Sequence, residues 1–318
     1  AAVSGHAELR SVGFSAARTR VTGRSGEAIG LALRSSPSLR EFTLGFGDTA
    51  IGLETHAAIG AALEENSKLE GASLQVQGLQ FGRREGSVLA KAIRLSKGLR
   101  SLELRADRAF GFDDSTLAAL GAGVAKAATK PLERLVLRAQ GAAFGDAGAA
   151  AFAAGIRECG ALRELEFDAE GTAVRDGCGA ALVEAAARCP ELRRLQISVA
   201  GTDIGNDFCS AMANGFRDNA RLEAFAFDAT NTKVGDEGGQ AMARLIESAF
   251  ELRSFAANLS CSKVGSETAI ALAGALEGHN HVESFTLRAS RTALADDGVA
   301  ALFAAAASGR RRGVAPAL

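Results

Sequence analysis

The chain has 318 residues, of which 47% are hydrophobic, so it has enough apolar material for a large core. Its 36 basic and 37 acidic residues leave a formal net charge of −1, which excludes the general attraction to phosphate backbones that nucleic-acid-binding proteins need. No apolar stretch approaches the roughly 18 to 20 residues that cross a bilayer. We therefore expect no nucleic-acid partner and no direct membrane insertion.

The cysteines indicate a reducing environment. The five cysteines are an odd number scattered over a long chain, and no pair has the spacing of a zinc site. We expect an intracellular, reduced compartment, either the cytoplasm or an organelle. The chain begins with Ala1-Ala2 instead of Met, which leaves open a removed targeting segment. No metal or other cofactor is expected.

An apolar pattern, L-x-x-Φ-x-Φ with Φ an apolar residue, recurs along the whole chain. We number the repeats from one to ten by their first residue, which is Leu9, Leu39, Leu69, Leu99, Leu132, Leu162, Leu192, Leu222, Leu252 and Val282. Every step is 30 residues except one of 33, between Leu99 and Leu132. Periods of this size indicate a solenoid. We predict a single repeat domain over residues 1–318, ending in a tail over residues 308–318.

Each repeat begins with a predicted strand. Apolar and other residues alternate, as at Val12 and Phe14 in the first repeat and at Phe285 and Leu287 in the last. This is the period of a strand with one buried face. Seven residues after the third apolar position of the pattern, or eight in the fourth repeat, an apolar residue anchors the following loop in the core. These anchors are Val21, Ile51, Phe81, Phe112, Phe144, Val174, Ile204, Val234, Val264 and Leu294.

A helix is predicted after each anchor. Asp, Asn or Ser follows two residues later in seven repeats, at Asp114, Asp146, Asp176, Asn206, Asp236, Ser266 and Asp296. These residue types favour the N-cap of a helix, so each is expected to cap the helix that it precedes. Thr recurs two residues before the anchor, as in Thr172, Thr202 and Thr232, and its hydroxyl is expected to bond loop amides.

The runs LRELEF at 162–167 and VGDEGGQAMARLIESAFELRSF at 234–255 resemble leucine-rich repeats of the ribonuclease-inhibitor type, in a variant with units of about 30 residues. The resemblance implies an α/β horseshoe of about ten repeats, with a parallel sheet on the concave face and helices on the convex face. The family usually carries an Asn shortly after the strand. Here the matching inward position is Ala or Val, as in Ala139 and Val199.

The outward strand positions are the candidate binding residues, because they line the concave face. The most charged of them lie in the middle of the array and form what we call the central strip: Glu103, Arg105, Asp107, Arg134, Arg138, Gln140, Glu164, Glu166, Asp168, Arg194 and Gln196. One interpretation is a partner-binding site. The other is a solvated face that keeps the sheet soluble and discourages edge pairing.

Three functions are compatible with this pattern. The first is a protein-interaction scaffold or recognition module that binds a partner protein on its concave face, with Arg-led contacts because Tyr and Trp are absent. The second is a subunit or fragment of a larger assembly with a structural role. The third is a GTPase-activating role, since Ran GTPase-activating proteins are similar in fold and loop arginines occur at Arg18, Arg20, Arg108 and Arg291. Catalysis is not expected.

Overall fold

The computed structural model describes residues 8–126, 132–218 and 221–310. In these ranges strands and helices alternate, one of each per repeat. The strands are β1 (Ser11–Ser15), β2 (Glu41–Gly45), β3 (Gly71–Gln75), β4 (Ser101–Arg105), β5 (Arg134–Arg138), β6 (Glu164–Asp168), β7 (Arg194–Ser198), β8 (Ala224–Asp228), β9 (Ser254–Asn258) and β10 (Ser284–Arg288). They form one ten-stranded sheet in chain order, and every neighbouring pair is parallel.

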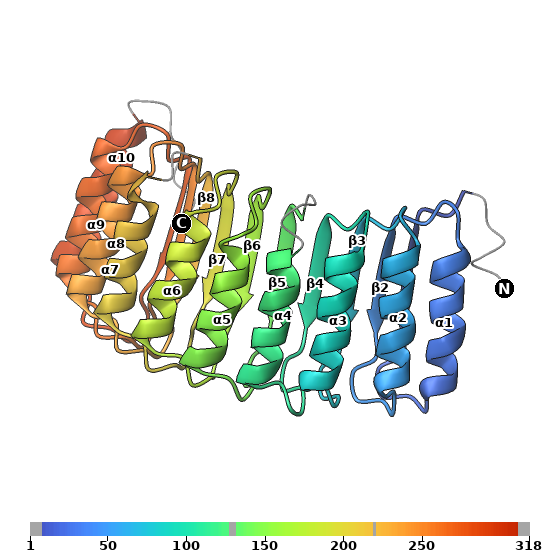
Figure 1. Ribbon diagram of the computed structural model, residues 1–318. Coiled ribbons are helices and arrows are strands. Elements are labelled where there is room, and N and C mark those ends of the chain that lie inside the picture. The colour runs from blue at the N-terminus through green and yellow to red at the C-terminus, as the bar shows by residue number, and fades with distance from the viewer. Residues whose placement is uncertain (1–7, 127–131, 219–220, 311–318) are drawn as a thin grey trace.

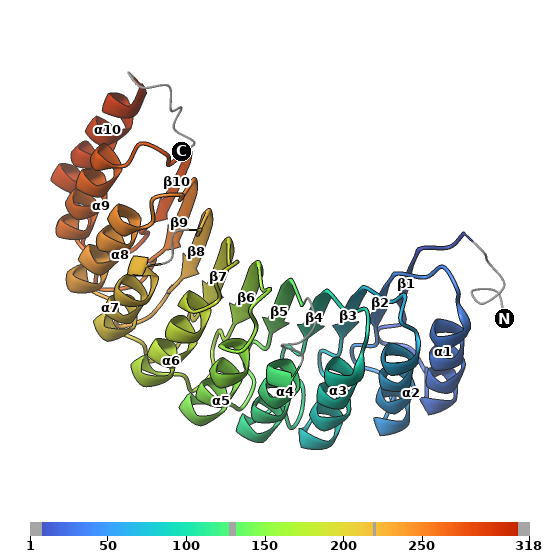
Figure 2. The same ribbon diagram turned by 45° about the horizontal axis from the view of Figure 1, so that its top comes forward.

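The helices lie on the opposite side of each repeat from the concave sheet face. They are α1 (Gly23–Ser35), α2 (Leu53–Glu65), α3 (Arg83–Leu95), α4 (Asp114–Lys126), α5 (Asp146–Ile156), α6 (Asp176–Ala187), α7 (Asn206–Gly215), α8 (Asp236–Ser248), α9 (Ser266–Gly278) and α10 (Asp296–Arg310), with a 3-10 turn, η1, at Phe216–Asp218. Successive helices stand side by side (Figure 1). Strands follow the inner side of the arc and helices the outer side (Figure 2). The predicted curved α/β leucine-rich-repeat solenoid is therefore confirmed.

The end of the array differs slightly from the prediction. Helix α10 continues to Arg310, three residues into the predicted tail, and residues 311–318 lie outside the described ranges.

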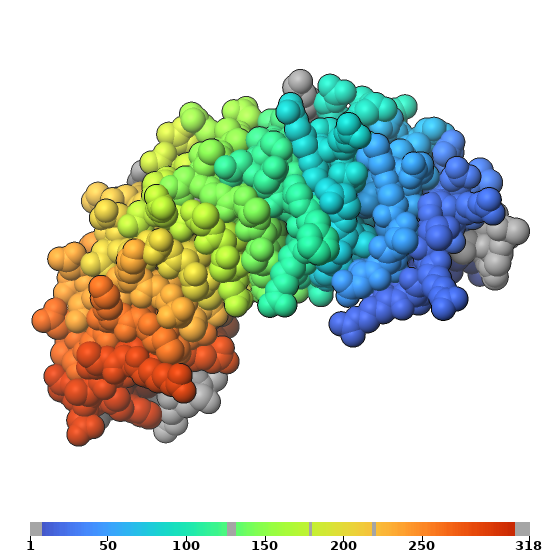
Figure 3. All heavy atoms as spheres, turned by 90° about the horizontal axis from the view of Figure 1, so that it is seen from below, coloured from blue at the N-terminus to red at the C-terminus, as the bar shows by residue number. Residues whose placement is uncertain are grey.

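Within the described ranges, none of the helices combines the length and apolarity that a membrane crossing requires. In space-filling view the repeats form one continuous arc from the first to the last (Figure 3).

The core is a column of side chains that runs the length of the array between sheet and helices. The inward strand residues and the loop anchors of the second to ninth repeats are buried as predicted, whereas those of the two end repeats are partly exposed, as at Phe14. Phenylalanines in equivalent positions pack against one another across repeats. Phe81, Phe112 and Phe144 have ring centroids 6.1 Å apart at each step. Phe225 and Phe255 repeat this contact at 5.7 Å on the strands. Such ring spacings are favourable for aromatic pairs, so each repeat is stabilised mainly by the next.

The predicted helix caps bond the next helix instead of their own. The residue before each of these helices is usually a glycine, and the Asp or Asn is the first residue inside the helix. Asp236 Oδ1 accepts hydrogen bonds from the amides of Gly265 and Thr268, which begin α9, at 2.7 and 3.1 Å. Asp114 and Asn206 do the same for α5 and α8. Our assignment of these residues to their own helices was wrong for the repeats before the last, because the side chain points along the solenoid, whereas Asp296 begins α10, after which the structure describes no further helix.

The threonine prediction also needs correction. The Thr172 hydroxyl donates to the carbonyl of Ala169 at 2.7 Å, and Thr202 and Thr232 donate to the equivalent carbonyls. In these repeats the hydroxyl therefore satisfies a backbone acceptor within its own turn, whereas we expected it to bond loop amides. At Thr292 it does both, because it also accepts from the Leu294 amide at 3.4 Å. It closes the turn that follows the strand.

The first three repeats lack the side chain that caps the next helix. Gly23, Leu53 and Arg83 occupy the position that Asp236 holds in the eighth repeat. The consequence is visible at Thr55, which is equivalent to Thr268. The Thr268 hydroxyl donates to Asp236 at 2.5 Å, but the buried Thr55 hydroxyl has no hydrogen-bond partner.

We predict that Gly23→Asn stabilises the first repeats by about 1 kcal/mol, since its side-chain oxygen would accept from the Thr55 hydroxyl and from the amides that begin α2, as Asn206 does for α8. Space exists, because a Cβ at Gly23 would meet only Glu54 Oε2, at 3.8 Å, and the neutral amide avoids repulsion from that carboxylate. The measurement is the free energy of unfolding in urea. Gly23→Ala is the control for the loss of glycine entropy. If the two variants are equally stable, the Asn oxygen has not made these bonds.

Candidate functional site

The strands place nine residues of the central strip on the concave face in three rows, and Asp107 and Gln140 follow just beyond the ends of β4 and β5. Strand register puts Arg134 beside Glu164, and Glu164 beside Arg194. The parallel pairing of β4 to β7 therefore brings the predicted residues together, as the sequence pattern implied. The pattern did not show which of these charged side chains form ion pairs with one another.

The first part of the strip is a chain of ion pairs. Arg105 Nε lies 2.5 Å from Glu103 Oε1 within β4. Arg134 of β5 donates to Glu164 of β6 at 3.0 Å and also faces Glu103 at 3.9 Å. Each of these side chains is half-buried, so solvent screens the pairs only in part. Three strands are thus linked by alternating charges.

The second part of the strip is the most buried. Arg138 donates to Glu166 at 2.5 Å, and only 8% of Glu166 is exposed. The hydrogen bond to Glu166 raises the pKa of Arg138, against the opposing effect of burial. Between them, Val136 points to the concave side yet is fully buried, so the long side chains around it cover it. This patch is a closed, internally neutralised surface.

The carboxyl ends of the strands form an acidic rim. Gln140 donates to Asp168 at 2.7 Å, and its backbone amide donates to Asp107 at 3.1 Å. Glu170, which holds the position of Gln140 in the next repeat, is exposed. Partial desolvation raises the pKa of Glu170, and the carboxylates of Asp168, Asp228 and Asp107 raise it further. The potential at this rim is therefore negative.

Arg194 and Gln196 differ from the rest of the strip. Both are exposed, and neither makes a side-chain hydrogen bond or ion pair within the part of the chain that the structure describes. On the next two strands the first two outward positions hold small, half-buried side chains, Ala224, Ala226, Ser254 and Ala256, while at the third position Asn258 donates to Asp228 at 3.0 Å. These four small residues form an open surface on β8 and β9, which we call the open floor. Arg194 lies at its border and has no ion-pair partner among the described residues.

Two features escaped the sequence reading. The residue before each strand is Arg or Glu. Residues of opposite charge in neighbouring repeats form ion pairs: Arg40–Glu70, Arg100–Glu133–Arg163, Arg193–Glu223 and Arg253–Glu283. The signal was present as opposite charges spaced by one repeat. The second feature is Phe110, 66% exposed in the loop of the one repeat with 33 residues. It stands beyond the strand ends, next to the acidic rim in sequence.

The remaining candidates are not brought together. Arg18, Arg108 and Arg291 occupy the same left-handed turn position in the first, fourth and tenth repeats, with φ of 58°, 52° and 58°. They are therefore separated along the sheet, and Arg18 faces Asp48. Among the described residues, no group of three His, Cys, Asp or Glu side chains could hold a metal ion.

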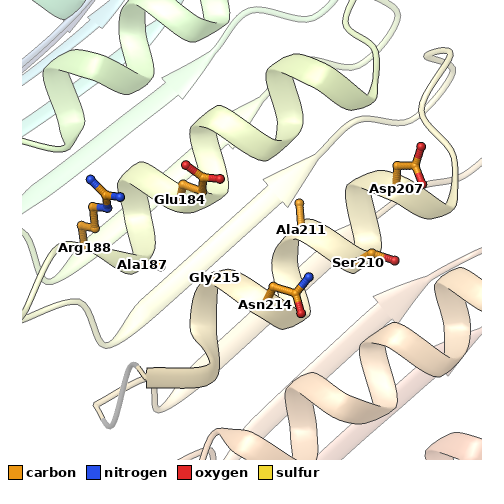
Figure 4. A pocket seen from close by; sticks show the side chains of 8 residues that line it. All are labelled: Glu184, Ala187, Arg188, Asp207, Ser210, Ala211, Asn214 and Gly215. Atoms are coloured by element: carbon orange, nitrogen blue, oxygen red, sulfur yellow. The ribbon is translucent and has the colours of Figure 1, made fainter.

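A groove lies on the convex side. It lies between α6 and α7, has a volume of about 590 Å³, and is lined by Glu184, Ala187, Arg188, Asp207, Ser210, Ala211, Asn214 and Gly215 (Figure 4). Glu184 and Arg188 come from α6, and the other charged residue, Asp207, from the start of α7. Its walls mix both charges with small side chains, so it selects no particular chemistry.

The thiols described by the structure are free. Cys159, Cys189 and Cys209 are buried and Cys261 is exposed. Burial raises the pKa of the Cys159 thiol to about 11 and that of Cys189 to about 12. Both thiols are protonated at neutral pH, so they pack as small apolar groups rather than act as nucleophiles.

Comparisons with known proteins identify no relative by sequence. No known family description matches the chain, and no curated protein matches it. Among solved structures, an internalin from Listeria monocytogenes is similar over 99% of this chain and 88% of its own, with 13% identity and a TM-score of 0.43. The C-terminal domain of Caenorhabditis elegans tropomodulin is similar over 49% and 90%, with 14% identity and a TM-score of 0.35.

A structure of the second actin-binding site of leiomodin-1 is similar over 43% of this chain and 75% of its own, with 12% identity and a TM-score of 0.35. At such values none of these likenesses bears on activity or partners. The leucine-rich-repeat architecture follows from the chain's own recurring pattern and from its single ten-stranded sheet.

We predict that Arg138→Met destabilises the chain by about 1 to 3 kcal/mol, because the methionine still covers Val136 but leaves the Glu166 carboxylate without its cation. The matched control is Arg100→Met. Its pair with Glu133 is more exposed, at 53% and 28% of the two side chains, so its loss should cost less than about 1 kcal/mol. Equal losses in urea unfolding would contradict the difference in burial.

Proposed function

We propose that this chain is a protein-interaction module of the ribonuclease-inhibitor type of leucine-rich repeat, which binds a partner protein on its concave face and has no catalytic role. The observation that carries the proposal is the contrast on that face. From β4 to β6 the charges are already paired, whereas Arg194 and Gln196 are free beside an open floor of small side chains.

The paired charges support binding by holding side chains in fixed positions. Ordering long side chains on binding has an entropic cost, and this cost is reduced when the groups are already held by their neighbours. Arg138 and Glu166 are held in this way. A partner meeting this part of the face would contact a rigid, neutral surface and not a set of mobile charges.

The free groups indicate the chemistry of the partner. Arg194 offers a fork of donors to a carboxylate, and Arg is frequent among residues that dominate interface energies. Glu170 and its neighbours at the opposite ends of the strands favour a cation. The small residues Ala226 and Ala256, on β8 and β9, leave room for larger side chains on the side of Arg194 that faces away from Glu170. We therefore propose a partner surface that offers a carboxylate to Arg194, a basic group to Glu170 and apolar side chains to β8 and β9.

We also propose that the protein works in a reduced intracellular compartment. The buried free thiols Cys159, Cys189 and Cys209 support this proposal, because the fold uses them as packing groups and not as disulfide partners.

The test is Arg194→Glu in the intact chain. Because Arg194 is exposed and makes no ion pair with any residue that the structure describes, folding should be retained, while partner affinity should fall at least tenfold. Partners would be captured from the native extract and identified by mass spectrometry, and affinities then measured with the purified partner. Arg244→Glu is the control, since Arg244 is exposed on α8 of the convex side. A partner that tolerates Arg194→Glu but not Arg244→Glu would place binding on the convex side.

A second candidate function is a structural subunit that associates end to end with a second copy of the chain. Apolar side chains are exposed at both ends of the described array, with Phe14 at 44% and Phe303 at 50%. The charges are complementary as well. The row of Arg and Glu residues that precede the strands ends at Glu283 in the last repeat, and Arg10 holds the equivalent position in the first.

For this candidate we predict a molar mass that rises with concentration in light scattering. Glu283→Arg should weaken the association by opposing Arg10, and adding Arg10→Glu should restore it, because the swapped pair regains opposite charges. A single monomer mass over the accessible concentration range would rule the association out. So would a double variant that associates no better than Glu283→Arg alone.

A further inference from the structure

Two buried side-chain atoms lack a partner, and they belong to neighbouring residues. Within the described residues, Thr55 Oγ1 and His56 Nε2 are the buried side-chain nitrogen and oxygen atoms without a hydrogen bond. Both stand in the first turn of α2, where 0% of Thr55 and 6% of His56 are exposed. Buried polar groups are nearly always paired, so an exception calls for a physical explanation. The missing carboxylate at Gly23 explains Thr55, but not His56.

The position of His56 explains why it is exceptional. Five residues after the anchor, Gly26, Gly86 and Gly239 press against a threonine of the following helix. A Cβ on Gly86 would lie 2.9 Å from Thr116, and one on Gly239 would lie 2.2 Å from Thr268. The second repeat has His56 at this glycine position, and the third has Glu85 at the threonine position. A close contact of small groups is thus replaced by two large ionisable side chains.

The surroundings of His56 suit only its neutral form. Its Nδ1 lies 3.0 Å from the Gly52 carbonyl and must donate there, which leaves Nε2 as a bare acceptor in the neutral ring. The ring meets Phe81 edge-on, with centroids 5.2 Å apart. Glu85 is the charged group that faces it, but Glu85 already accepts from the Gly82 amide at 2.9 Å. Burial lowers the pKa of His56 below 6.5, although Gly52 and Glu85 act in the opposite direction.

We propose that the junction between α2 and α3 is an acid-sensitive joint, at which protonation of His56 loosens the first two repeats from the other eight. Protonation adds an N–H at Nε2 that is buried and has no acceptor in place. Since each repeat packs only on its neighbours, one junction can open while the remaining repeats stay folded. The first three helices are also the ones without the Asp, Asn or Ser side chain that caps the next helix.

The direction of the pH dependence follows from the lowered pKa of His56. Below pH 6.5 the open state binds the proton more readily than the closed state. The closed junction therefore has its full stability above pH 6.5 and loses it as the pH falls toward the lower pKa of the closed state. In that window the opening equilibrium should increase by up to about tenfold per pH unit.

The experiment is hydrogen exchange of the full chain at pH 7.5 and at pH 5.5, corrected for the intrinsic rate. We expect protection of α2 and β3 to fall by up to about tenfold in acid, with α8 and α9 unchanged. The comparison is His56→Leu, because Leu117 fills the same position in the fourth repeat. Its α2 should lose the pH dependence. An unaltered acid response in His56→Leu, or one spread evenly over all repeats, would overturn the proposal.

If His56→Leu does not fold, an NMR titration of the His56 ring in the unmodified chain decides the matter. The midpoint should lie below 6.5 and should fall further in Glu85→Gln, which keeps an acceptor for the Gly82 amide but removes the charge. The exposed His281 serves as the reference. A midpoint at or above 6.5 for His56 would show that the closed junction accepts the proton, and the proposal would fail.

Discussion

The parallel pairing of each strand with its equivalent one repeat away is the interaction on which the rest of the structure depends. It keeps all ten strands in register, with no shift even across the fourth repeat, which is three residues longer. Because the register is kept, any side chain meets the same position of the next repeat about 5 Å away. Side chains at the same position of successive repeats therefore form a row along the solenoid, and the contacts within these rows hold the repeats together.

These rows differ in what they contribute. The phenylalanine stacks supply the apolar contact between repeats, and the Asp and Asn residues at the starts of the helices satisfy amides that would otherwise have no acceptor. The Arg and Glu row before the strands is largely exposed, so solvent weakens it, and it contributes more to register than to stability. The phenylalanine row and the row of Asp and Asn residues at the helix starts therefore contribute more to stability than the exposed ion pairs do.

The same reasoning separates the two parts of the concave face. Where charged rows meet, as at Arg138 and Glu166, the groups neutralise one another and little is left for a partner beyond shape. Where small side chains replace them, as at Ala226 and Ala256, the backbone of the sheet becomes approachable and Arg194 has no bonding partner among the described residues. The binding surface that we propose arises from this interruption of a row. His56 is an interruption of another kind, inside the core, and its effect is on the joint between repeats.

Much of this was determined by the sequence alone. The 30-residue recurrence, the strand alternation and the buried anchors are properties of single repeats and their spacing, so the curved solenoid and the concave position of the central strip could be read directly. The partner of each polar side chain could not. Asp236 caps the next helix, Arg138 bonds Glu166, and His56 faces Glu85, each across a separation of about one repeat. Only the tertiary structure decides such contacts, because the side chains point along the solenoid axis, where pairing depends on how neighbouring repeats are stacked.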